Sequence, residues 1–503
     1  MKYSLLKLYH ALPSPLRSCA ASAHGWRLRA WRYGRETDLL VEAAAARETW
    51  TAVDWAMWQK IRLDTILSKA IKSVPFYREL WRRQKITSGR GSSEKQGVVG
   101  RAGVPEQPWR ELENWPVLKK EDVRKCPEAF MAEGTDRRRM LCEHTSGTTG
   151  TPLTLWQSRE TVREWYGLME VRWRRWNGLS RSNRWAMLGG QLIVPIRQAK
   201  APFWVWNSGL NQLYMSSYHL SRETCASYLE AMRRSRVVYV WGYASSLYSL
   251  ALFAEQLQLD VPPLKVVISN AEPLFAHQRE LIGRVFRCPI RDTYGMSEMV
   301  CGASECDAGT MHLWPEAGVY EVLCEDADKP VRLGQPGRLV CTGLLNSDML
   351  LIRYEVGDRV AIASPDVRCS CGRNLPIVLS IEGRNDDTVL ALDGRRVGRL
   401  DPVFKSDIPI QEAQIVQEAL DFFRVLIIAT PSFTFAHERA LVSALQERVG
   451  TVRVQVERVA SIPRSANGKF RAVISRVGSR IQSDPMEGGA QAGADTGARS
   501  NDL

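Results

Sequence analysis

The sequence predicts an α/β protein with a large N-terminal domain of parallel-rich sheets and helices, followed by a small mobile α+β domain. Short β-branched runs at 236–243, 265–273 and 289–295 alternate with amphipathic stretches, which is typical of a parallel α/β sheet. Charges and glycines then interrupt the apolar pattern near 381–389. Beyond this break, strand, helix and strand patterns follow in order, which is enough for a separate domain.

We therefore divide the 503 residues into a large domain at 1–383, a small domain at 384–481 and a disordered tail at 482–503. Residues 1–86 are expected to be helical, because apolar residues recur three and four positions apart. Residues 87–108 lack an apolar period and contain many Gly, Ser and Pro, so we expect a flexible insertion there. The tail has almost nothing to bury.

Composition limits the class of protein. Hydrophobic residues make up 45% and charged residues 24% of the chain, which argues against a fibrous, wholly disordered or membrane-spanning protein. The excess of 68 Lys and Arg over 55 Asp and Glu gives a net charge of +13. Such a charge is compatible with nucleic acid, an anionic membrane or an anionic small molecule, and does not choose among them.

The first 35 residues hold seven Lys or Arg and no acidic residue. A basic helix that docks its tryptophans on the main body is favoured there over peripheral contact with a lipid surface. No stretch of 18 uncharged apolar residues is present, so we expect no transmembrane segment. Pro13, Pro15 and Arg17 interrupt any signal-peptide core, and the cytoplasm is the expected location.

The stretch "HTSGTTGTPLTL" at 144–155 is rich in glycine and hydroxyl groups. Glycine lets backbone N–H groups approach an anion, and Ser and Thr hydroxyls donate to its oxygens, so a phosphate is one interpretation. The usual phosphate loop needs a lysine that this stretch lacks. On composition alone an ordinary surface connection is the favoured alternative.

Six motifs occur in the order known from the adenylate-forming ligases, which convert a carboxylate and ATP into an acyl-adenylate and pyrophosphate. They are "TSGTTGTP", "SNAEPL", "YGMSE", "RYEVGD", "GRNDD" and "NGKFR", spanning roughly 143–471. The stretches "VPFYRELW", "WPVLKKEDVR" and "CSCGRNLP" resemble the phenylacetate–CoA ligase family, and particularly its capsular-polysaccharide branch. This resemblance implies ATP, Mg²⁺ and coenzyme A as the small molecules used.

The resemblance also assigns residues to the nucleotide site. The opening loop would wrap the ATP phosphates through Thr145, Ser146, Gly147, Thr148, Thr149 and Gly150. Asn270, Ala271 and Glu272 would line the adenine and acyl pocket. Tyr294 would stack on the purine, with Gly295 and Ser297 beside it. Donors of this kind matter most where charge develops in the transition state.

Further residues follow from the same resemblance. Glu298 would hold Mg²⁺, since a hard cation prefers oxygen ligands near the phosphates. Asp358 would accept the ribose hydroxyls, although a structural salt bridge is the favoured alternative for that residue taken alone. Arg384 would also contact the ribose, and Asp386 would be the hinge of the small domain. Lys469 would be catalytic, because its ammonium can reach both the carboxylate and the α-phosphate.

Eleven cysteines, an odd number without an export signal, indicate reduced thiols. Cys306, His312, Cys369 and Cys371 together could form a closed zinc set, and some relatives are similar here. Buried thiols with a core histidine are the alternative. Tyr218 and His219 fall where related ligases often place an aromatic gate beside the acyl pocket, and core packing explains both equally well.

Alternatives remain for the function. The adenylate could pass to coenzyme A, or to an amino sugar, an amine or a carrier protein, or to no acceptor. A scaffold of envelope polysaccharide assembly, working with partner proteins and without catalysis, is a second class. Nucleic-acid binding is a third, and we exclude it because no binding module or aromatic and basic stripe accompanies the positive charge.

Overall fold

The computed structural model describes residues 2–84, 108–144, 153–195, 197–384, 389–392, 396–397, 400, 403, 408–464 and 470–477. The chain forms two compact units, Met1–Asn385 with Pro463–Arg471, and Asp386–Ile462 with Ala472–Leu503. The sequence assigns 463–471 to the small domain, whereas the structure groups this segment with the first unit. The predicted tail, and all but the last residue of the predicted insertion, lie outside the described residues.

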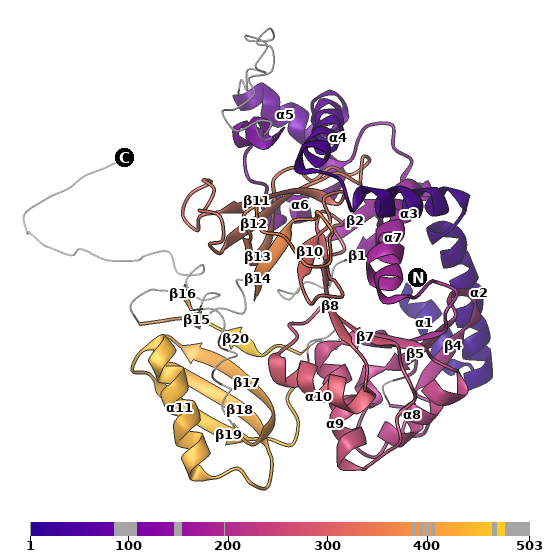
Figure 1. The fold of residues 1–503 in the computed structure, drawn as a ribbon, viewed down its shortest axis with the longest axis vertical. Helices are drawn as coiled ribbons and strands as arrows, with labels where there is room; N and C mark the ends of the chain where they lie inside the picture. Colours follow the sequence, from indigo (N-terminus) through magenta and orange to yellow (C-terminus); the bar gives the residue numbers. More distant parts are fainter. Residues whose placement is uncertain are drawn as a thin grey trace, which may run out of the picture. The chain divides into compact units, whose positions relative to one another are not determined.

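The N-terminal part of the first unit consists of helices (Figure 1): α1 (Lys2–Ala11), α2 (Ser14–Arg32), α3 (Arg35–Arg47), α4 (Ala52–Ser73) and α5 (Pro75–Gln84). A capping box starts α4, because Thr51 accepts from the Asp54 amide while the Asp54 carboxylate accepts from the Thr51 amide. Apolar residues of α4, among them Leu63 and Ala70, are buried. No helix among the described residues is long and apolar enough to cross a membrane.

A twelve-stranded sheet forms the centre of the first unit, in the order β11-β12-β13-β14-β10-β9-β8-β7-β6-β3-β5-β4. Five neighbouring strands are parallel: β3 (Trp185–Gly189), β5 (Gln212–Ser216), β6 (Tyr239–Tyr243), β7 (Val266–Asn270) and β8 (Ile290–Gly295). The last three coincide with the β-branched runs of the sequence. The predicted parallel α/β architecture is confirmed in this half of the sheet.

Antiparallel strands make up the rest of the sheet: β4 (Trp204–Asn207), β9 (Gly302–Glu305), β10 (Met311–Leu313), β11 (Gly318–Leu323), β12 (Gly337–Gly343), β13 (Tyr354–Ile362) and β14 (Ile377–Arg384). A separate hairpin of β1 (Leu141–His144) and β2 (Thr154–Gln157) flanks the predicted phosphate loop. A short helix, α6 (Lys120–Lys125), precedes this hairpin.

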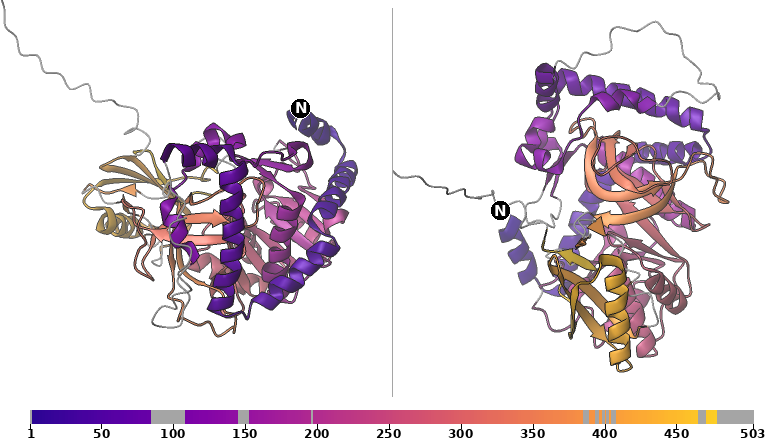
Figure 2. Two further views of the ribbon diagram at one scale, coloured as in Figure 1. Left: turned by 90° about the horizontal axis from the view of Figure 1, so that it is seen from above. Right: turned by 90° about the vertical axis from the view of Figure 1, so that its left-hand side faces the viewer.

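Alternate side chains of the parallel strands enter two different cores, because successive residues of a strand face opposite sides. Ala186 and Leu188 pack with α8 (Cys225–Arg234), α9 (Ala244–Gln256) and α10 (Ala276–Phe286). Trp185 packs on the other side with α3 and α7 (Arg159–Met169), which continues into a π-helical turn at Glu170–Arg174. Helix α2 lies beside β4 at the edge of the sheet (Figure 1), and the indigo N-terminal helices can be followed along the first unit in Figure 2.

The second unit is a smaller α+β domain. Its sheet has the order β19-β18-β17-β20, formed by β17 (Ile410–Ala419), β18 (Phe422–Ala429), β19 (Arg453–Arg458) and β20 (Val473–Ser475). Leu441 and Leu445 of α11 (Phe435–Val449) join a core that includes Phe423 of β18. A two-stranded ribbon of β15 (Val389–Leu390) and β16 (Arg396–Val397) belongs to the same unit. The predicted fold class, with a separate small C-terminal domain, is confirmed.

Candidate nucleotide site

The carboxyl ends of the parallel strands place one predicted site residue, Asn270, in a row with Tyr243 and Thr293. Tyr243 at the end of β6 pairs with Asn270 at the end of β7, and Asn270 pairs with Thr293 of β8. Open α/β sheets bind ligands at this edge of the strands. Ala271 follows with a φ of 63°, a left-handed conformation that turns the chain sharply after β7.

Asn270 and Glu272 at this edge differ in hydrogen bonding: the Asn270 side-chain oxygen has no partner, whereas the Glu272 carboxylate has two. The buried Oδ1 atom of Asn270 has no hydrogen-bond partner, which is a cost that a ligand donor would remove. Glu272 accepts from the backbone N–H of Ser245 at 2.9 Å and from that of Phe470 at 2.7 Å. Burial raises the pKa of Glu272 above its usual range. Lys469 lies outside the described residues, but Phe470, the residue after it, is therefore held at this edge.

Tyr294 and Asp358 are 64 residues apart in sequence and lie in direct contact. The Tyr294 hydroxyl donates to Oδ2 of Asp358 at 2.5 Å. Burial raises the pKa of Tyr294, and the negative charge of Asp358 raises it further. On the backbone, Asp358 of β13 pairs with Arg384 of β14. The structure thus assembles the residues predicted to bind purine and ribose.

Glu298 follows this edge and is buried, with a lysine beside it. Its Oε1 atom accepts from Lys120 Nζ at 2.9 Å and from the Tyr354 hydroxyl at 2.9 Å. Burial alone would raise the pKa of Glu298, but the Lys120 charge and these hydrogen bonds outweigh it and hold the pKa below its usual range. Glu298 is therefore a charged, oriented carboxylate.

Four further predicted residues form a compact cluster on the antiparallel half of the sheet. The ligand atoms of Cys306, His312, Cys369 and Cys371 all lie within 4.8 Å of one another. Cys306 Sγ is 3.7 Å from Cys369 Sγ, and Cys371 Sγ is 3.4 Å from His312 Nε2. Nδ1 of His312 lies 3.2 Å from the Leu375 carbonyl oxygen. This contact fixes the ring so that Nε2 faces the thiols.

Known proteins resemble the chain in sequence and in structure. The CapK C-terminal domain family matches residues 391–476. Protein CapK of Staphylococcus aureus is 26% identical over 429 residues, which cover 83% of this chain and 89% of that protein. A 2-hydroxyisobutyryl-CoA ligase in the postadenylation state, in complex with 2-HIB-AMP, matches with a TM-score of 0.63 and 20% identity, over 87% of this chain and 94% of that one.

The chain has the fold of the adenylate-forming ligases. An open conformation of the same 2-hydroxyisobutyryl-CoA ligase, in complex with 2-HIB-AMP and CoA, matches with a TM-score of 0.52 and 21% identity, over 85% of this chain and 93% of that one. The fold that the motifs imply is confirmed, and Protein CapK is similar to the chain in sequence.

Other predicted residues of this ligase fold have structural partners of their own. The Ser297 carbonyl accepts from the Gln157 side chain. The Tyr218 hydroxyl donates to the Gly190 carbonyl, and the His219 ring stacks on Phe203. These contacts agree with the packing alternative for the pair.

The loop at 145–150, Asp386 and Lys469 lie outside the described residues, so the roles assigned to them from the motifs stay predictions. Lys120 is a candidate that the sequence reasoning missed. It occurs in "WPVLKKEDVR", which was used for the family resemblance only. The sequence shows a lysine at the start of a short helical stretch, but it does not show the partner of this lysine, which lies 178 residues away.

Proposed function

We propose that this protein is an ATP-dependent, AMP-forming ligase that activates a carboxylic acid as an acyl-adenylate. The observation that carries the proposal is the contact between Tyr294 and Asp358, next to the strand end where Asn270 holds an unpaired oxygen. An unpaired buried acceptor suits the exocyclic amine of a purine. Two side chains from distant segments therefore meet where this fold would place a nucleotide.

In the proposed reaction, a carboxylate oxygen of the acid attacks the α-phosphorus of ATP. The bond from the α-phosphorus to its bridging oxygen breaks, and pyrophosphate leaves with that electron pair. No protein nucleophile is needed, since alignment and charge stabilisation do most of the work. The loop at 145–150 would donate hydrogen bonds to the leaving phosphates, and Lys469 would neutralise charge at the α-phosphate and the carboxylate.

The donor set at Glu298 fits a magnesium ion. Lys120 and Tyr354 both bond to Oε1, so that Oε2 faces neither of them. A single carboxylate oxygen with phosphates and water is a common arrangement for Mg²⁺, which would supply charge neutralisation at the phosphates when bound. Glu298→Gln should raise the Mg²⁺ concentration at half-maximal rate, whereas a titration curve identical to wild type would remove Glu298 from the metal site.

Coenzyme A is the acceptor that we propose for the second step, in which the thiol attacks the adenylate and releases AMP. Support comes from the 2-hydroxyisobutyryl-CoA ligase whose structure contains 2-HIB-AMP and CoA. The resemblance of the motifs to the capsular-polysaccharide branch supports a role in polysaccharide synthesis, where an amino sugar or another amine would be the alternative acceptor. Transfer of the adenylate to each acceptor class would distinguish these two proposals.

We also propose that the cysteine and histidine cluster holds a structural zinc ion. Three thiols and one imidazole nitrogen lie within 4.8 Å of one another, which is the number and kind of ligands of a closed structural zinc site. Cys306 follows β9, His312 lies on β10, and Cys369 and Cys371 lie in the connection between β13 and β14. Zinc would therefore join strand β10 to two loops that the chain brings together over more than 60 residues.

The test of the proposed function is pyrophosphate release from ATP with a panel of aryl, fatty, sugar and amino acids. At least one acid should stimulate release, and Asp358→Ala should reduce that rate, because the ribose would lose its acceptor. If no acid stimulates release and ATP does not bind, a silent scaffold becomes the better explanation. Strong DNA retention at physiological salt would also contradict the ligase proposal.

A further inference from the structure

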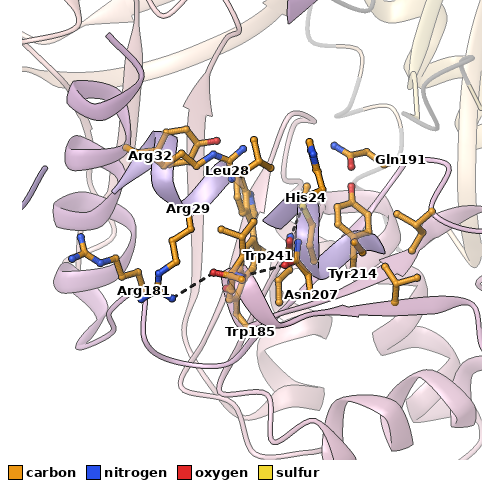
Figure 3. Close-up of a pocket in the computed structure, with 18 of the residues that line it drawn as sticks. His24, Leu28, Arg29, Arg32, Arg181, Trp185, Gln191, Asn207, Tyr214 and Trp241 are labelled. Carbon is orange, nitrogen blue, oxygen red and sulfur yellow. Dashed lines mark hydrogen bonds between the residues drawn. The ribbon is translucent and has the colours of Figure 1, made fainter. Parts of the chain in front are cut away.

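A large pocket lies between helix α2 and the parallel strands, and we call it the Trp185 pocket (Figure 3). Its volume is about 900 Å³, and its walls come from α2, β1, β3, β5 and β6. Trp185 and Trp241 lie at its centre. Arg29 and Arg181 lie on one side of them, and Tyr214 and Gln191 lie on the other.

The arginine side of the pocket is positively charged. Four arginines line the pocket, whereas Glu143 is the one carboxylate among the described residues that line it. Arg174 is neutralised by Glu170 at 3.0 Å, and Arg181 by Asp38 at 2.6 Å.

Arg29 and Arg32 form no ion pair with any part of the chain that the structure describes. The Arg32 guanidinium lies 4.2 Å from the centroid of the Tyr166 ring, and Arg29 makes a long contact of 3.4 Å with the Gly209 carbonyl. Glu143 forms no ion pair with either arginine in the described part of the chain; burial raises the pKa of Glu143, and the charge of Arg32 opposes this rise. The pocket therefore presents two guanidinium groups that have no carboxylate at ion-pair distance among the described residues, with Glu143 as the acidic group of the same wall.

The opposite wall is aromatic and contains unpaired donors. The Tyr214 side chain is only 6% exposed, and its buried hydroxyl donates to no acceptor. The indole N–H of Trp241 is also buried without an acceptor. Unpaired buried donors cost free energy unless a ligand supplies acceptors. Flat indole rings beside such donors suit a planar or apolar molecule that carries oxygen acceptors.

The strand register connects this pocket to the candidate nucleotide site. Met187 and Trp241 are paired on β3 and β6 and both line the pocket. Trp241 lies two residues before Tyr243, whose partner on β7 is Asn270. Residues two apart on a strand share one face and are separated by about 6.6 Å. Trp241 in the pocket wall and Tyr243 beside Asn270 therefore lie on the same face of β6. Glu143, also in the wall, lies two residues before the start of the loop at 145–150.

We propose that the Trp185 pocket binds the acid to be activated, and that Arg29 and Arg32 select an acid with an apolar or ring-containing body and a second anionic group. This inference rests on the proposed ligase function, because it takes the activated carboxylate to lie at the Asn270 edge. The second anion would then pair with the two arginines at the far end. Guanidinium groups bind carboxylates and phosphates with paired, charge-assisted hydrogen bonds.

The experiment compares phenylacetate with 1,4-phenylenediacetate, which adds a second carboxylate to the same ring, and with adipate, which has two carboxylates and no ring. Pyrophosphate release gives kcat/KM for each acid, and calorimetric titration without ATP gives binding. Arg29→Gln and Arg32→Gln remove one charge each. Arg27→Gln is the matched control, because Arg27 is exposed on the same helix and does not line the pocket.

Wild type should prefer 1,4-phenylenediacetate to phenylacetate by at least about 10-fold, and each of the two pocket variants should reduce that preference by about 10-fold to 100-fold. The control should keep it, and adipate should bind more weakly because it lacks the ring. An unchanged ratio of kcat/KM values in both pocket variants, or a wild-type preference for phenylacetate, would overturn the inference.

The two readouts separate this inference from the proposed function. Binding of 1,4-phenylenediacetate that is lost in Arg32→Gln, without pyrophosphate release from any acid, would support the pocket's ligand class and overturn the ligase function. Pyrophosphate release with acids that bear no second anion, without any binding of 1,4-phenylenediacetate, would keep the ligase function and overturn the assignment of Arg29 and Arg32.

Discussion

The parallel and antiparallel halves of the large sheet differ in how far the hydrogen bonds of their buried polar side chains are satisfied. On the parallel half, Asn270, Tyr214 and Trp241 each have a buried polar atom without a hydrogen-bond partner. On the antiparallel half, between residues 302 and 384, no described side chain has such an atom. There, for example, Arg353 makes paired contacts of 2.9 and 3.0 Å with Glu321.

This difference distinguishes buried polar atoms whose hydrogen bonds are satisfied within the protein from buried polar atoms that could still bind a ligand. A buried polar atom without a partner costs about 1 to 3 kcal/mol, so a fold keeps several together only where something else satisfies them. The parallel half has them beside a pocket and at the carboxyl ends of its strands. The antiparallel half supplies Asp358 to that edge. Its other polar groups, including the cysteine and histidine cluster, make contacts with one another.

The largest effect on catalysis that we expect comes from Lys469→Ala. Loss of one charge-stabilising contact typically costs about 10²-fold to 10³-fold in rate, and acid-dependent pyrophosphate exchange should fall by that factor. Attack of a thiol on a preformed adenylate should change little, because the lysine serves the first half-reaction. The exposed Lys125→Ala is the control. Equal losses in both half-reactions would contradict this two-step assignment.

The next largest effect should be a loss of stability in Cys371→Ser, at the cysteine and histidine cluster on the antiparallel half of the sheet. If zinc is bound there, a free zinc concentration of about 100 times its Kd contributes about 2.7 kcal/mol to stability, and the substitution should remove most of it. Thermal unfolding with and without a chelator, together with elemental analysis, measures this. Cys324→Ser, outside the cluster, should keep the wild-type response. Purified wild type without stoichiometric zinc would end the proposal.

A smaller effect should be a pH dependence of stability that comes from Asp292 in the parallel half of the sheet. Burial raises the pKa of Asp292 on β8 to about 7, and the nearby charge of Glu305 also raises it. A raised carboxyl pKa gives stability that is present below about pH 4 and is lost as pH rises through 7. Asp292→Asn should therefore be more stable than wild type at pH 8, by on the order of 2 kcal/mol, and similar at pH 4.

Denaturant unfolding of Asp292→Asn and wild type across pH 4 to 8 makes this comparison. Two parallel stability curves would show that Asp292 does not titrate in the folded protein near neutral pH. A variant that loses stability at pH 8 would reverse the sign and contradict the burial argument.

Much of the fold could be predicted from the sequence, for reasons that are local. The runs around Val240, Val267 and Ile290 have the composition of buried parallel strands, and the polar residues after them lie at one sheet edge as the pattern indicates. The cysteine and histidine grouping was also visible as residue types, although only the fold shows that their ligand atoms meet.

The pairing of distant side chains could not be predicted in this way. No period or motif connects Lys120 with Glu298, or indicates that the Tyr294 hydroxyl bonds to Asp358. The Trp185 pocket likewise combines segments from α2 to β6, and each segment alone resembles ordinary core or surface. Tertiary packing, which single-sequence patterns do not contain, decides these contacts.

The most direct test of the central claim is calorimetric titration of AMP into wild type, Asp358→Ala and Asn270→Ala. Our account predicts one binding site per chain, with affinity reduced by about 10-fold or more in each variant, because each loses a charge-assisted or otherwise unpaired hydrogen-bonding group at the strand edge. Absence of AMP binding to wild type, or equal affinities in all three proteins, would contradict the claim that this edge is the nucleotide site.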